Sequence, residues 1–181
     1  MARCPTRCRP PALQVLFGLA ALALPAVACG PPAFPASVHH PLLGAHLPEI
    51  HRKSLDGHSF DGSALSGTAV LVKFFADYCQ PCKETLPAAE RIHEAYPEVV
   101  FLGIDEDESS DLARDVARRY GLSFPVVHDA SNVLAGRFRV SSMPMTFVAD
   151  GTGTIRWIGA EGQTEEELRQ AVQAARAVRA P

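Results

Sequence analysis

The stretch VLVKFFADYCQPCKETLP, residues 70–87, contains a closely spaced pair of cysteines, Cys79 and Cys82. It opens within a run of β-branched, aromatic and other apolar residues, 68–76, that is typical of a strand buried on both faces. After the pair, apolar side chains recur at helical spacing over residues 82–96. The sequence therefore predicts that the two cysteines lie where a buried strand ends and a helix begins.

This position favours redox chemistry. The unpaired N–H groups and the dipole at a helix N-terminus stabilise a thiolate, which is the attacking species in thiol-disulfide exchange. We expect Cys79 to be this nucleophile. Cys82, two residues further, is near enough to attack the resulting mixed disulfide and release the substrate. Pro81 suits the first turn of a helix because it lacks an N–H to leave unpaired.

Other uses of a cysteine pair fit the sequence less well. Haem attachment requires a histidine directly after the second cysteine, and here that residue is Lys83. Structural zinc requires four ligands. The remaining cysteines (Cys4, Cys8 and Cys29) belong to an N-terminal segment that we expect to lie outside the folded part. We therefore expect neither a metal nor a bound cofactor.

The N-terminal residues 1–28 are typical of a secretory signal peptide. Three arginines precede an uncharged apolar stretch that is densest over residues 15–24, and small residues follow. This apolar core is shorter than the roughly 20 residues of a membrane-spanning helix. Cys29 follows Ala-Val-Ala and resembles the acylated cysteine of bacterial lipoproteins, although Ala26 stands where leucine is usual. Lipidation of Cys29 and plain secretion both place the chain outside the cytoplasm, on the periplasmic side.

Residues 29–46 are rich in proline and contain no Asp, Glu, Lys or Arg, which predicts a semi-extended tether. Their three histidines (His39, His40 and His46) do not have the spacing of a metal site. Without residues 1–28 the chain keeps 14 basic and 20 acidic residues, a formal charge of −6. This acidic balance argues against a nucleic acid as partner.

The folded part is expected at residues 47–181. Strand and helix patterns alternate along it, and the last two strands form a hairpin, which predicts an α/β domain with a mixed sheet. The acidic segment 105–111 is expected to join a strand to a helix, with Ser109 or Ser110 as N-cap; it lacks the glycine and closing glutamate of a calcium loop. A first hairpin is predicted near Asp56-Gly57. The predicted strands are 68–76, 99–105, 124–129 and the two strands of the hairpin around residues 151–153. The predicted helices are 82–96, 110–120, 131–139 and 165–178.

The strand–CxPC–helix unit resembles the thioredoxin fold, and more closely the extracytoplasmic TlpA/ResA-type thiol-disulfide oxidoreductases. The likeness covers about residues 47–178. It includes the N-terminal hairpin, the helix–strand insert around 110–129 and the segment SSMPMTFVADGTGTI, residues 141–155. It implies a mixed central sheet flanked by helices, Cys79 as nucleophile and Cys82 as resolving thiol. It also implies a cis Pro144 facing the disulfide, with Met143 offering backbone groups to a substrate.

Two positions depart from this family in ways that bear on proton handling. Many relatives have a glutamate three residues after the second cysteine; here that residue is Thr85, and Glu84 comes one residue early, where we expect it to face solvent. Lys73 stands in the place of the buried acid of thioredoxin. A buried cation there would favour the thiolate and titrate when desolvated, whereas a lysine that reaches water past apolar neighbours would be structural.

The sequence thus predicts an oxidoreductase that reduces disulfides of extracytoplasmic proteins. By resemblance, its electrons come from a membrane donor of the thiol-relay type, and cytochrome c maturation is a client pathway. A thiol peroxidase is one alternative, but the peroxiredoxin pattern of Pro and Thr before the reactive cysteine is replaced by Val72 and Ala76. A thioredoxin-fold binding module with an idle cysteine pair is the other.

Overall fold

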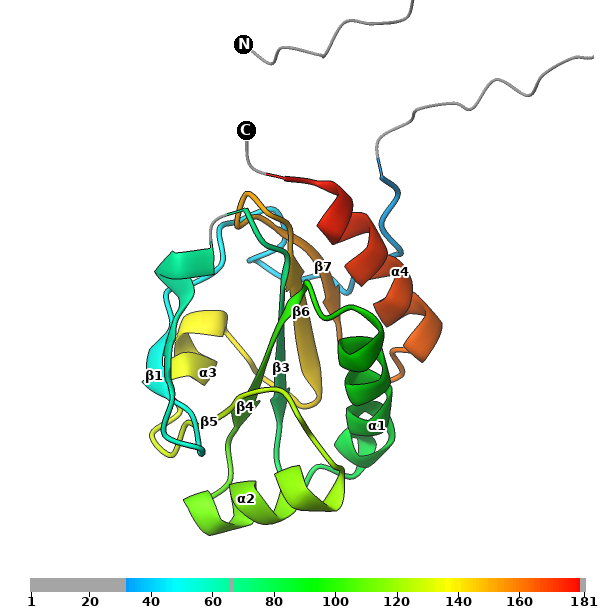
Figure 1. Cartoon of the computed structure of the whole chain (residues 1–181). Coiled ribbons are helices and arrows are strands. Elements are labelled where there is room, and N and C mark those ends of the chain that lie inside the picture. Colours follow the sequence, from blue (N-terminus) through cyan, green and yellow to red (C-terminus); the bar gives the residue numbers. More distant parts are fainter. Residues whose placement is uncertain (1–31, 66, 180–181) are drawn as a thin grey trace, which may run out of the picture. The chain divides into compact units, whose positions relative to one another are not determined.

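A computed structural model describes residues 32–65 and 67–179 of the 181-residue chain. Within them, five strands form one mixed sheet in the order β5-β4-β3-β6-β7 (Figure 1). The pairs β3–β4 and β4–β5 are parallel, and β3–β6 and β6–β7 are antiparallel. The strands are β3 (Val70–Phe75), β4 (Val100–Asp105), β5 (Val126–His128), β6 (Met145–Ala149) and β7 (Ile155–Gly159).

Helices cover both faces of this sheet (Figure 1). The first buried cluster joins α1, α2 and α4 to one face and contains both cysteines and Trp157. The second lies on the opposite face beneath α3 and contains Phe74 and Phe147. The helices are α1 (Gln80–Ala95), α2 (Ser110–Arg119), α3 (Val133–Phe138) and α4 (Glu165–Ala177), with a short 3₁₀ helix η1 (Gly62–Leu65). Every residue of β3 is buried, as its continuous apolar run predicts.

A separate hairpin pairs β1 (His51–Lys53) with β2 (Ser59–Asp61). Its turn contains Gly57 at a φ of 87°, which glycine adopts without the steric penalty of other residues. Downstream, Ser109 caps α2 by accepting the Leu112 N–H. Thr164 and Glu167 form a capping box at the start of α4. The predicted α/β order and mixed sheet are therefore confirmed, with element ends displaced by at most two residues.

Part of the predicted tether packs on the edge of the sheet. Val38 N donates to Ile158 O at 3.0 Å, and Trp157 Nε1 donates to Ala36 O at 3.0 Å. The first bond pairs a carbonyl that the edge strand β7 would otherwise leave unpaired, and the second satisfies the buried indole N–H of Trp157, demands that proline content does not reveal. The expected signal peptide and Cys29 lie outside the described residues. Within those residues, no helix is long and apolar enough to cross a membrane.

Candidate active site

Cys79 and Cys82 form a disulfide at the N-terminal end of α1. Cys79 is the N-cap residue, and its Sγ accepts the backbone N–H of Cys82 at 3.2 Å. Pro81 occupies the first turn, so the helix begins at Gln80, two residues before the expected start. Cys79 is 5% exposed and Cys82 is 0% exposed. An incoming group therefore reaches the sulfur of Cys79 before that of Cys82.

A groove of about 550 Å³ opens beside Cys79. The peptide bond between Met143 and Pro144 is cis, as the family resemblance implies, and Met143 lines this groove. Glu106, directly after β4, lines it as well. The full lining is Tyr78, Cys79, Gln80, Pro81, Glu106, Val140, Ser141, Ser142 and Met143. The structure thus brings the predicted cysteine and the predicted substrate-binding segment to one surface.

Four acidic side chains lie at or near this edge of the sheet, and three of them accept hydrogen bonds from backbone N–H groups. Asp107 accepts the Asp77 N–H at 2.9 Å, and Asp105 accepts the Asp107 N–H at 3.1 Å. Asp129 accepts the Leu134 N–H at 2.7 Å at the start of α3. Burial, and then its neighbour Asp107, raise the pKa of Asp105. The fourth acid, Glu106, has a buried Oε1 with no hydrogen-bond partner among the described residues.

Lys73 lies in the middle of β3 and is 0% exposed. Because side chains alternate along a strand, it faces the same side of the sheet as Leu71 and Phe75, the side that carries the cysteines. Its Nζ donates to Thr146 Oγ1 at 3.3 Å. Burial lowers the pKa of Lys73 from 10.5 to about 7. Of the two alternatives for Lys73, the one in which its ammonium reaches water is wrong, because the side chain is fully buried.

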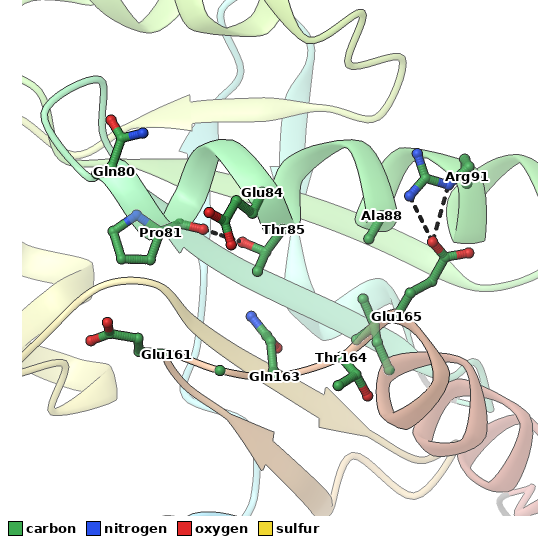
Figure 2. A pocket seen from close by; sticks show the side chains of 12 residues that line it. Gln80, Pro81, Glu84, Thr85, Ala88, Arg91, Glu161, Gln163, Thr164 and Glu165 are labelled. Carbon is green, nitrogen blue, oxygen red and sulfur yellow. Dashed lines mark hydrogen bonds and ion pairs between the residues drawn. The ribbon is translucent and has the colours of Figure 1, made fainter.

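A second pocket, of about 460 Å³, lies between the start of α1 and the loop before α4 (Figure 2). Glu84 is exposed on its rim, as its place on the helix predicts, and does not line the groove of Met143. Thr85 bonds back to the carbonyls of its own helix turn. Figure 2 shows Gln163 directed toward α1, and both atoms of its amide are buried without partners among the described residues.

Sequence reasoning did not single out Glu106, Thr146 or Gln163. For Glu106 a signal exists, because it directly follows the second of two parallel strands, at the same sheet edge where Cys79 emerges. Thr146 and Gln163 carry no such signal, since their positions depend on strand register and loop path. The described residues contain no group of three or more His, Cys, Asp or Glu side chains placed to hold a metal.

Comparison with known proteins agrees with this geometry. The model of the AhpC/TSA family matches residues 43–158. The chain belongs to this family. It is 30% identical to the thioredoxin-like protein YneN of Bacillus subtilis over 131 residues, covering 70% of this chain and 76% of that one. It is 27% identical to the thiol-disulfide oxidoreductase ResA of Bacillus thuringiensis over 128 residues, covering 70% and 74%.

Solved structures agree on the fold of this AhpC/TSA member. A secreted disulfide oxidoreductase of Mycobacterium tuberculosis, described as homologous to Escherichia coli DsbE, superposes with a TM-score of 0.64 at 25% identity, covering 69% of this chain and 95% of that one. The chain is therefore a thioredoxin-fold thiol-disulfide oxidoreductase of the TlpA/ResA type. Its reaction transfers electrons between protein thiols and disulfides.

Proposed function

We propose that Cys79 and Cys82 are the redox-active pair and that the protein reduces disulfides of extracytoplasmic proteins. One observation carries this proposal: the Cys79 sulfur lies at the N-terminus of α1, where it accepts the Cys82 N–H, and it borders the groove lined by Met143. Helix N-termini stabilise thiolates, so the same position favours the attacking form once the pair is reduced.

The exchange conserves electrons and protons. The Cys79 thiolate attacks one sulfur of a substrate disulfide, and the other substrate sulfur leaves as a thiolate that takes a proton. Cys82 then loses its proton and attacks Cys79 Sγ, which re-forms the Cys79–Cys82 disulfide and releases the second substrate thiol. The substrate gains two electrons and two protons, and an external dithiol donor returns the pair to its reduced state.

Lys73 supports this cycle in the proposal. An ammonium enclosed on the same face as the cysteines stabilises negative charge on sulfur, and its lowered pKa lets it exchange a proton near neutral pH. Pro144 and Met143 are proposed to hold the backbone of the substrate in the groove. Glu84, exposed on the other pocket, is a weaker candidate for proton handling because it does not border the groove.

The proposed setting is the periplasmic side of a membrane. It is supported by the signal-like residues 1–28, by Cys29, which resembles an acylated lipoprotein cysteine, and by the similarity to a secreted disulfide oxidoreductase of Mycobacterium tuberculosis. We propose Cys29 as lipid anchor, residues 29–46 as a tether of which residues 36–38 pack on β7, and residues 47–181 as thioredoxin-like domain. A membrane thiol-relay protein would supply electrons, and proteins of cytochrome c maturation are proposed clients.

Trapping of the mixed disulfide tests these roles. Reduced Cys82→Ser should accumulate a covalent adduct with a disulfide-containing protein, because the resolving thiol is missing. Cys79→Ser should form none, and neither variant should turn over. Equal adduct formation by the two variants would contradict the assignment. A parallel assay gives the reduced wild-type protein hydrogen peroxide in place of the disulfide-containing protein. Faster consumption of peroxide than of disulfide would favour the alternative that the protein is a thiol peroxidase.

A further inference from the structure

The groove beside Cys79 has a carboxylate with no counter-charge. Glu106 Oε1 is buried and accepts no hydrogen bond within residues 32–65 and 67–179, and no ion pair there includes Glu106. Asp105, Asp107 and Asp129 each accept a backbone N–H, although Asp105 Oδ2 is also buried without a hydrogen-bond partner among the described residues. Burial, and then the charge of Asp129, raise the pKa of Glu106. A cation brought to this carboxylate would relieve both effects.

An exposed aromatic ring stands at the same groove. Tyr78, the residue before Cys79, is 70% exposed although it is a large side chain. Tyr78 and Glu106 line the same groove. Burial raises the pKa of the Tyr78 phenol, and so do the charges of Glu106, Asp107 and Asp105. An aromatic face beside a carboxylate is a combination that binds lysine and arginine side chains.

We propose that Tyr78 and Glu106 select disulfide partners that carry a lysine or arginine next to the reactive cysteine. The methylene stem would lie on the Tyr78 ring and the cationic end would pair with Glu106 while Cys79 attacks the neighbouring sulfur. This inference rests on the proposed function, because it requires the substrate cysteine to enter the groove of Cys79. It assigns Glu106 to substrate selection and gives it no part in bond breaking.

Three cyclic peptide disulfides test the inference with the full-length reduced protein. They are identical except for the residues that flank one cysteine, which are lysine, glutamine or glutamate. We expect kcat/KM for the lysine peptide to exceed that for the glutamine peptide on the order of tenfold, since hydrogen bonds between charged groups are the stronger ones. The glutamate peptide should be reduced more slowly than the glutamine peptide. Added salt should make the differences in kcat/KM among the three peptides smaller.

Variants separate selection from structure. Glu106→Gln should bring the lysine peptide close to the glutamine peptide, and Glu106→Lys should reverse the order so that the glutamate peptide is favoured. A role in folding alone would not reverse a preference. Tyr78→Ala should reduce the preference by a few-fold. Glu108→Gln is the matched control, because Glu108 is exposed two residues away and does not line the groove; it should keep the preference.

The outcomes distinguish the two claims. If the wild-type protein reduces the three peptides at equal rates, the selection by Glu106 is wrong and the proposed function stands. If it reduces none of them, the proposed function is wrong and the inference falls with it. A preference that persists in Glu106→Gln and Glu106→Lys would also overturn the inference.

Discussion

Lys73 donates a hydrogen bond from Nζ to Thr146 Oγ1 at 3.3 Å, across neighbouring strands of the central sheet, and both side chains are 0% exposed. An ammonium has three N–H donors, and Thr146 satisfies one of them. A lone buried charge with so little compensation destabilises a fold. When Lys73 is protonated, its ammonium therefore lowers the stability of the fold, on the same face of the sheet as the two cysteines.

Replacement of this lysine should stabilise the protein in acid. The pKa of Lys73 is lowered in the folded state, so between about 7 and 10.5 the unfolded chain binds the extra proton and stability rises with pH. Below pH 7 the fold must enclose the ammonium. Lys73→Met should therefore raise the free energy of unfolding at pH 6 by about 1–4 kcal/mol, with a gain that shrinks toward pH 10. Urea unfolding measures this.

Lys53→Met is the control for that experiment, because Lys53 lies exposed on β1 and the substitution removes the same charge. It should change neither the stability nor its pH dependence appreciably. A Lys73→Met protein that keeps the wild-type slope between pH 7 and 10 would show that Lys73 is not the group that titrates.

The same substitution should make Cys79 of the reduced protein react more slowly with an alkylating reagent. If the ammonium stabilises the thiolate, Lys73→Met should lower the rate of alkylation of Cys79 at pH 7 by about three- to tenfold. Mass spectrometry after timed iodoacetamide treatment measures the rate at each cysteine. Lys73→Arg keeps a permanent charge and should retain reactivity if it folds. An unchanged rate in Lys73→Met would leave Lys73 without a role in the chemistry.

Asp129 is expected to hold the start of α3. The formal N-cap residue, Asn132, makes no capping bond with its side chain, whereas Asp129 Oδ2 accepts the N–H groups of Leu134 and Ala135 at 2.7 and 3.0 Å. Asp129→Ala should cost about 1–3 kcal/mol because it leaves buried donors unpaired. Asp129→Asn retains an acceptor oxygen and should cost less. Equal losses in the two variants, measured by urea unfolding, would contradict the capping role.

The edge of the sheet gives a further prediction. Ser37 Oγ accepts the Ile158 N–H at 3.1 Å, beside the Val38–Ile158 backbone bond. Ser37→Ala should lower the free energy of unfolding by about 1 kcal/mol and speed hydrogen exchange at Ile158, since an edge amide loses its acceptor. Ser37→Thr keeps the hydroxyl and serves as control. Unaltered exchange at Ile158 would mean that residues 36–38 do not protect β7.

Much of this architecture follows from local pattern. The buried run of β3, the proline in the first turn of α1 and the capping box of α4 each act within a few residues, so the sequence predicts them well. The partner of Lys73 depends on the register of β3 against β6, and the packing of residues 36–38 depends on an unpaired edge. These are contacts between distant parts of the chain, which periodicity does not encode.

The candidate site divides in the same way. The spacing of Cys79 and Cys82 and the strand before them predict the position of the pair directly. Glu106 joins the groove only because β3 and β4 are parallel and end at one edge. The sequence predicts a strand that ends just before Glu106, but it does not state that this strand pairs with β3. From the sequence alone, Glu106 is therefore interpreted as one more charged residue of an acidic loop.

The reduction potential of the Cys79–Cys82 pair tests the central claim most directly. The full-length protein is equilibrated with graded dithiothreitol or glutathione buffers, and the free thiols of these two cysteines are quantified by mass spectrometry. A protein that donates electrons to disulfides should have a potential near about −250 mV or lower, in the range of thioredoxin. A potential near about −120 mV, typical of a strong oxidant, would contradict the proposed direction of electron transfer.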